Sequence, residues 1–194
     1  YFSSSDKSFK STDELHRYGI RTREIGLNWA KADIRFDLSK EVNEPNKVGY
    51  VVEIDPLNPN STPKKHTALG RFKHENAELV ISKDGKIIVY MGDDERGEYL
   101  YKYVSNESIN EVKDKSTLLS NGNLYVAKFN DNFTGEWLLL DTQTTGLSSK
   151  AEVCIFTRLA ASKVGATTMD RPEWIASNPK KNEVCCCLTN NKNR

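Results

Sequence analysis

The fold class that the sequence predicts is mainly β, a partial β-propeller of antiparallel blades with one or two short helices inserted. From residue 48 onward, short runs of β-branched and aromatic residues alternate with turns rich in Gly, Pro, Asn and Asp. One strand–turn–strand segment, residues 77–94, also resembles a second, residues 172–191, and both end in paired Asp or Asn. Repeated hairpins of this kind are typical of propeller blades, whose strand ends gather around one axis.

The first segment, about residues 1–47, is expected to be irregular and helical. Ser11-Thr-Asp-Glu14 has the pattern of a capping box, because the Ser11 hydroxyl can accept an amide of the first turn while Glu14 reaches back. The pattern predicts a short helix that continues through Tyr18 and stops at Gly19.

Blade hairpins are expected over residues 48–194, which together with the first segment form a single domain, 1–194. The predicted strands are 48–54, 67–72, 78–81, 86–91, 98–104, 123–129, 135–140, 173–176 and 183–188. Asp84-Gly85 predicts a tight turn between two of them. A helix is expected over residues 150–163, as an insertion near 150–164 that Gly165 ends. Asp55, Asp131 and Asp141 are interpreted as turn residues.

The composition is that of an ordinary globular protein. Of the 194 residues, 37% are hydrophobic and 28% are charged, and the net charge is +1. Without a basic excess, no nucleic-acid partner is expected, and no apolar run is long enough for insertion into a membrane. Because the chain opens at Tyr1 without an export leader and closes on a polar turn, we expect an interior piece of a longer protein.

The four cysteines, at positions 154, 185, 186 and 187, lack the spacing of a zinc site. Alternation along a strand places Cys185 and Cys187 on one face and Cys186 on the other. We interpret the cysteines as small buried hydrophobic residues, with a ligand or disulfide role as the alternative.

Acidic side chains gather at the predicted strand ends. His74-Glu75 precedes one hairpin, Asp93-Asp94-Glu95 follows it, and Asp170-Arg171-Pro172-Glu173 precedes the next. Carboxylates from several strand ends suit hard cations such as calcium, and the guanidinium of Arg171 matches a phosphate with two parallel hydrogen bonds. A metal ion and an arginine together reverse the repulsion between carboxylates and a phosphate, as phosphoryl transfer requires. A solvated turn and a surface salt-bridge cluster are the alternative interpretation.

Five segments carry a resemblance to a known family: residues 69–75, 92–99, 125–130, 165–174 and 188–191. They resemble the PhoX-type alkaline phosphatases, which are exported bacterial β-propeller enzymes that use calcium and iron. The resemblance runs from about residue 20 to the end of the chain, and Asp170-Arg171-Pro172-Glu173 is its most specific part.

The resemblance implies phosphoric monoester hydrolysis at a calcium and iron cluster on the propeller axis. By position, Glu75 corresponds to a carboxylate of the cluster that reaches iron, Asp94 to a calcium ligand, and Glu173 to a carboxylate shared by iron and calcium. Arg171 corresponds to the catalytic arginine that holds the substrate phosphate. A small-molecule phosphomonoester substrate, a monomer, and a periplasmic or extracellular location are implied as well.

Two departures from the family limit what this chain is expected to do alone. Thr168 stands where a lysine is expected, and none of the four cysteines corresponds to the iron thiolate, which the family supplies from a segment before the start of this chain. We therefore expect the chain alone to have little activity. Two other hypotheses stay open: a non-catalytic, calcium-stabilised β-propeller binding module, and an incomplete chain without a stable function.

Overall fold

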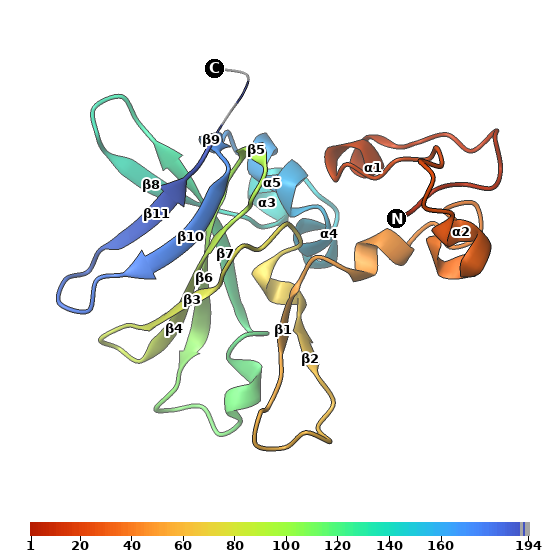
Figure 1. Cartoon of the computed structure of the whole chain (residues 1–194). Helices are drawn as coiled ribbons and strands as arrows, with labels where there is room; N and C mark the ends of the chain where they lie inside the picture. The colour runs from red at the N-terminus through yellow and green to blue at the C-terminus, as the bar shows by residue number, and fades with distance from the viewer. Residues whose placement is uncertain (191, 193–194) are drawn as a thin grey trace. The chain divides into compact units, whose positions relative to one another are not determined.

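The computed structural model, drawn in Figure 1, describes residues 1–190 and residue 192. The predicted fold class, mainly β with antiparallel sheets and short helices, is confirmed. The chain divides into two compact units, Tyr1–Gly49 and Tyr50–Arg194. This boundary lies next to the expected change of pattern at residue 48, whereas a single domain over residues 1–194 stays a prediction. Asn191, which ends the second repeat segment, lies outside the described residues.

The first unit contains short helices and an isolated β-bridge between Ser3 and Asp37. The helices are α1 (Asp13–Arg17), α2 (Trp29–Ala32), η1 (Ile34–Phe36) and η2 (Glu44–Lys47). The predicted first helix is present, but its N-cap is Thr12 and not Ser11. Thr12 has extended backbone angles and its side chain accepts a hydrogen bond from the Leu15 amide, which satisfies one of the free donors at a helix start.

Antiparallel pairing organises the second unit. Its strands are β1 (Val51–Glu53), β2 (Lys64–His66), β3 (Glu78–Ile81), β4 (Lys86–Gly92), β5 (Arg96–Glu98), β6 (Leu100–Ser108), β7 (Gly122–Phe129), β8 (Gly135–Leu139), β9 (Met169–Asp170), β10 (Pro172–Ser177) and β11 (Val184–Leu188). One sheet has the order β3-β4-β6-β7-β8, and three two-stranded sheets pair β1 with β2, β5 with β9, and β10 with β11. The two repeat hairpins, β3–β4 and β10–β11, therefore lie in different sheets, as predicted.

The turn between β3 and β4 has the predicted tight geometry. The Ser82 amide donates a hydrogen bond to the Lys86 carbonyl, and Gly85 has a φ of 80°. A side chain at this position would also collide with Ser108, since an added Cβ would lie 2.3 Å from its hydroxyl oxygen. Glycine is therefore required here both by the left-handed backbone and by the neighbouring strand.

The strand predicted over residues 67–72 is wrong. These residues form the 3-10 helix η3 (Thr67–Leu69) and a loop, and the partner of β1 is β2, which lies earlier in the chain. Leu69 and Phe72 are both buried, and their spacing of three residues suits a turn rather than the period of two in a strand. A second 3-10 helix, η4 (Lys115–Thr117), follows β6.

Three short helices cover part of the five-stranded sheet: α3 (Thr142–Thr145), α4 (Lys150–Ile155) and α5 (Thr157–Lys163). The single helix predicted over residues 150–163 is interrupted at Phe156, where the Thr157 hydroxyl bonds the carbonyls of Val153 and Cys154. Asp141 is not a simple turn residue, because it caps α3 in a capping box with Thr144.

The main core lies between the five-stranded sheet and these helices. Inward residues of β4 and β6, such as Val89, Met91 and Tyr101, pack against Val153 and Ala160 of α4 and α5. A smaller core joins the other side of the sheet to Ile175 of β10. Among the described residues, no helix is both long and apolar enough to span a membrane.

The cysteines agree only in part with the buried interpretation. Cys154 is buried and Cys186 is half-buried, but Cys185 and Cys187 are exposed. Strand alternation explains the difference, because β11 turns Cys186 toward the smaller core and its two neighbours toward the opposite face.

Candidate functional site

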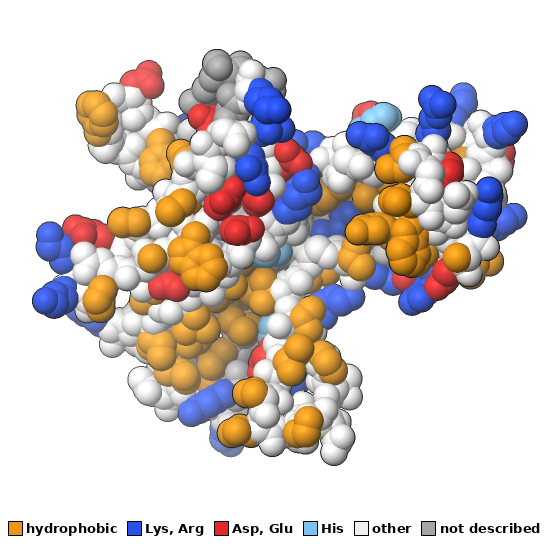
Figure 2. All heavy atoms as spheres, in the orientation of Figure 1, with side chains coloured by type: hydrophobic (Ala, Val, Ile, Leu, Met, Phe, Trp, Pro, Cys, Tyr) orange, Lys and Arg blue, Asp and Glu red, His pale blue; other side chains and the backbone are white. Residues whose placement is uncertain are grey.

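Arg171 stands at the centre of a cluster of charged side chains. Its Nη2 lies 2.8 Å from Oδ1 of Asp94 and 3.1 Å from Oε1 of Glu173. All three side chains are partly exposed, at 21–29%. Acidic and basic side chains lie next to one another on this face in the region of β5 and β10 (Figure 2). The structure thus brings together three of the four site residues predicted from the sequence.

The backbone at Arg171 is strained. Its φ is 55°, in the left-handed region that residues with a side chain rarely occupy, and Pro172 follows it. A conformation of this kind costs about 1–3 kcal/mol and is found most often at functional sites. With this backbone conformation the guanidinium lies against Asp94 and Glu173, at the point where β9 passes into β10.

Asp94 is positioned by the end of β4. Its amide donates to the Lys73 carbonyl at 3.0 Å, and its Oδ2 accepts a hydrogen bond of 3.0 Å from Nη2 of Arg171. Its Oδ1 is buried and has no hydrogen-bond partner of good geometry, although the same nitrogen lies near it. A buried carboxylate oxygen without a hydrogen bond has lone pairs with which it can coordinate a hard cation.

Glu173 is held by a different segment of the chain. Oε1 of Glu173 accepts a hydrogen bond of 2.7 Å from the hydroxyl of Thr189, and the Thr189 amide donates to the Asp170 carbonyl. The next residue, Asn190, accepts a hydrogen bond of 3.2 Å from Nη2 of Arg96. The residues that follow β11 therefore lie along one side of the charged cluster.

Glu75, the fourth predicted residue, is exposed and takes no part in the ion pairs of the described residues. The backbone of Glu75 nevertheless lies close to the segment that carries Asp94, since the Glu75 amide is 3.4 Å from the carbonyl oxygen of Gly92. Within residues 1–190, no group of three or more His, Cys, Asp or Glu side chains is arranged to hold a metal ion. Asp94 and Glu173 thus fit part of a cation site, and the full ligand set stays a prediction.

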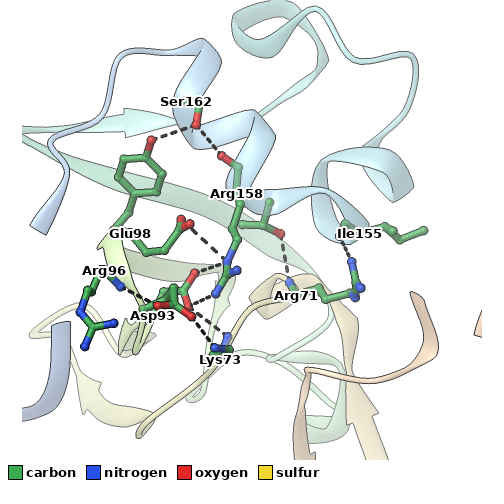
Figure 3. Close-up of polar contacts among 11 residues, drawn as sticks. Arg71, Lys73, Asp93, Arg96, Glu98, Ile155, Arg158 and Ser162 are labelled. Carbon is green, nitrogen blue, oxygen red and sulfur yellow. Dashed lines mark hydrogen bonds and ion pairs between the residues drawn. The ribbon is translucent and has the colours of Figure 1, made fainter. Parts of the chain in front are cut away.

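A second, buried ion cluster contains Asp93, the neighbour of Asp94 in the sequence (Figure 3). Nε and Nη2 of Arg158 each lie 2.7 Å from one carboxylate oxygen of Asp93, and Nε lies 3.8 Å from Oε2 of Glu98. These side chains are 0–3% exposed. Burial raises the pKa of Asp93, and the fork of Arg158 opposes that effect by favouring the charged carboxylate.

The sequence contained a signal for this buried cluster. Ile87, Val89 and Met91 form the inward face of β4, and the period of two places Asp93 on that same face. A carboxylate that continues a core-facing series needs a buried cationic partner. The identity of that partner, Arg158, had no local signal because it lies 65 positions later in the chain.

His74 is a poor candidate for a charged residue of the site. Burial lowers the pKa of His74 to about 4, so its imidazole is neutral at pH 7. Its Nε2 lies 3.0 Å from the Gly70 carbonyl, and its ring stacks on Phe72 at 3.7 Å. These contacts describe a histidine that packs and bonds within its own loop.

Comparisons with known proteins agree with one another. A family model described as alkaline phosphatase PhoX matches residues 2–194. Among solved structures, the chain is similar to Pseudomonas fluorescens PhoX in complex with vanadate, a transition state analogue, with 48% sequence identity and a TM-score of 0.90. That match covers 98% of this chain and 36% of the other, so this chain spans well under half of that protein's length. No curated protein matches.

Proposed function

The chain belongs to the PhoX alkaline phosphatase family, and we propose that it forms part of a phosphoric monoester hydrolase whose reaction centre lies at Arg171. The observation that carries the proposal is the strained Arg171 backbone, which aims one guanidinium at two carboxylates from different strands. The vanadate complex of Pseudomonas fluorescens PhoX supports phosphate chemistry in a protein of the same family.

Arg171 is suited to bind the phosphate of the substrate. The ion pairs with Asp94 and Glu173 all use Nη2, whereas a guanidinium carries five N–H donors in a fixed fork. The donors on Nε and Nη1 can therefore hold phosphate oxygens while Nη2 stays anchored. The two carboxylates fix the orientation of the fork and prevent it from swinging out into solvent.

We propose calcium and iron as the cofactors, with Asp94, Glu173 and Glu75 as their ligands from this chain. Asp94 and Glu173 are within reach of one Arg171 nitrogen, and Oδ1 of Asp94 has no hydrogen bond. When bound, the ions supply positive charge that polarises the phosphate and neutralises the carboxylates. The remaining ligands, a thiolate among them, come from parts of the protein outside this chain, so the chain alone has little activity.

The proposed substrate is a small phosphomonoester, and the proposed enzyme is a monomer that acts in the periplasm or outside the cell. With a net charge of only +1, the chain has no basic excess to attract nucleic acid, and nucleic acid is not a proposed partner. The proposed enzyme does not insert into a membrane. The rival function is a non-catalytic module that calcium stabilises. Metal analysis of the purified whole protein distinguishes the two, because iron together with calcium supports the enzyme and calcium alone supports the module.

The test is Arg171→Lys in the whole protein, with p-nitrophenyl phosphate as substrate. Lysine keeps the charge but loses the two-pronged geometry. Since a hydrogen bond to a charged group contributes about 1.5–3 kcal/mol, kcat/KM should fall by about 10-fold to 100-fold. The melting temperature should change little, because the ion pairs of Arg171 are partly exposed.

Arg35→Lys is the matched control, because Arg35 is an exposed arginine that pairs with Asp33 in the other unit. It should leave kcat/KM unchanged. If Arg171→Lys also leaves kcat/KM unchanged, Arg171 is not part of the reaction centre. A lower melting temperature without a kinetic loss would assign it a structural role.

A further inference from the structure

Asp93 and Asp94 are neighbours in the sequence but point in opposite directions. Asp93 continues the inward face of β4 after Met91 and is 0% exposed, whereas Asp94 faces Arg171 at the surface. A single peptide unit therefore connects a buried side chain to a side chain of the charged cluster. Because the two residues share one peptide unit, contacts that fix the position of Asp93 also restrain the backbone from which the Asp94 side chain extends.

Arg158 fixes the position of the Asp93 side chain. It extends from α5 and grips Asp93 with two hydrogen bonds of 2.7 Å, which makes the contact both charged and planar (Figure 3). A second link joins the same helix to the end of the loop, because the hydroxyl of Ser162 lies 2.9 Å from the Tyr99 hydroxyl and donates to the Arg158 carbonyl. The helix thus holds the loop from Asp93 to Tyr99 at both ends.

Asp93 also ties the neighbouring segment to the same point. Its Oδ1 accepts a hydrogen bond of 3.2 Å from the Lys73 amide, and the Lys73 carbonyl accepts from the Asp94 amide at 3.0 Å. Glu75 lies two residues after Lys73. One buried carboxylate therefore holds the two backbone segments that carry Asp94 and Glu75.

We propose that the buried pair of Asp93 and Arg158 positions Asp94 as a metal ligand, an inference that rests on the proposed function. Neither residue touches substrate or metal. The pair holds the Asp94 carboxylate in an orientation in which its Oδ1 has no hydrogen bond, although Nη2 of Arg171 lies 2.8 Å away, and this oxygen can serve a cation. Residues that orient a metal ligand affect metal affinity strongly, typically by about 10-fold to 100-fold.

The decisive variant is the double substitution Asp93→Asn with Arg158→Gln in the whole protein. It removes one negative and one positive charge, so the net charge near Asp94 stays the same and a loss of calcium affinity cannot be ascribed to simple electrostatics. It also removes both members of the closest buried pair, so Asp93 is not left charged without Arg158; Glu98, which lies 3.8 Å from Arg158, keeps its charge, and the melting curve measures what that costs. The matched control is Lys128→Gln with Glu136→Gln, the same kind of exchange at an exposed pair between β7 and β8.

Calcium binding to the metal-free protein is measured by calorimetry, together with kcat/KM for p-nitrophenyl phosphate and a melting curve. The double variant should fold, bind calcium about 10-fold more weakly or worse, and lose kcat/KM to a similar extent. The control should match the wild type in both measurements. The wild type serves as the reference for the proposed function, which fails if that protein shows neither calcium binding nor turnover.

Two results would overturn the positioning role while leaving the proposed function intact. The first is a folded double variant whose calcium affinity and kcat/KM stay within twofold of those of an active wild type. The second is a double variant that does not fold, because the pair would then determine the fold rather than the orientation of Asp94.

Discussion

Gly92, at the end of β4, packs tightly against the backbone of β10, and we predict that Gly92→Ala separates the two halves of the charged cluster. A Cβ added at Gly92 would lie 2.4 Å from the carbonyl oxygen of Pro172 and 2.6 Å from that of Glu173. Both obstacles are backbone atoms, which cannot move aside by changing a rotamer. Glu173 and Arg171 would therefore have to shift relative to Asp94.

The size of the shift follows from these distances. Ordinary van der Waals contact begins at 3.4 Å, so the Pro172 carbonyl has to move by the difference between 3.4 and 2.4 Å, which is about 1 Å. An added group in a tightly packed site costs about 1–3 kcal/mol of folding free energy. A displacement of about 1 Å between reacting groups can lower activity by about 100-fold.

The assay combines kcat/KM for p-nitrophenyl phosphate with the melting temperature of the whole protein. Gly97→Asn is the control, because Gly97 lies five residues later, in β5, and has a φ of 78°, but a Cβ there meets no atom within 4 Å. Asn tolerates this backbone region, so the control should lose some stability and keep its kcat/KM. If Gly92→Ala has the kcat/KM and melting temperature of the wild type, the backbone of β10 is free to move and the argument is wrong.

Two further predictions concern stability. Burial raises the pKa of Asp37, but hydrogen bonds from Ser5 and Ser39 outweigh that effect and bring the pKa to about 2. The contribution of Asp37 to the free energy of unfolding should therefore be complete above the unfolded pKa near 3.8 and fall by about 2 kcal/mol as the pH drops to 2. Asp37→Asn should flatten this pH dependence, measured by urea unfolding from pH 5 to pH 2. Thr157→Val removes the hydroxyl that accepts a hydrogen bond of 3.0 Å from the Arg71 amide, and it leaves that buried donor unsatisfied. The free energy of unfolding should therefore fall by about 1–3 kcal/mol. An unchanged melting curve would show that the amide finds another acceptor.

Local patterns in the sequence were sufficient where the structure depends on neighbours in the chain. Strand period and turn chemistry located β3 and β4 and the Gly85 turn between them, because both features act over a few residues. The break at Phe156 was missed, since it depends on the Thr157 hydroxyl and on a contact with Arg71, 86 positions away. Helical periodicity alone cannot report such a contact.

The candidate site shows the same division between local and distant information. The identities of Asp94, Arg171 and Glu173 came from short motifs, and their ion pairs confirm that these motifs lie together. The strain at Arg171 was not predictable, because a following proline restricts a residue without selecting the left-handed region.

The two neighbouring aspartates illustrate why the phase of a strand decides function. Residue type alone makes Asp93 and Asp94 equal candidates for a metal ligand, and both follow the same strand. Because β4 buries every second residue up to Met91, Asp93 must enter the core, where only a partner such as Arg158 makes its charge tolerable. Asp94 is then the residue left at the surface with an oxygen that no hydrogen bond satisfies. The alternation of buried and exposed residues along β4 therefore distinguishes the proposed ligand, Asp94, from Asp93, the buried residue proposed to position it.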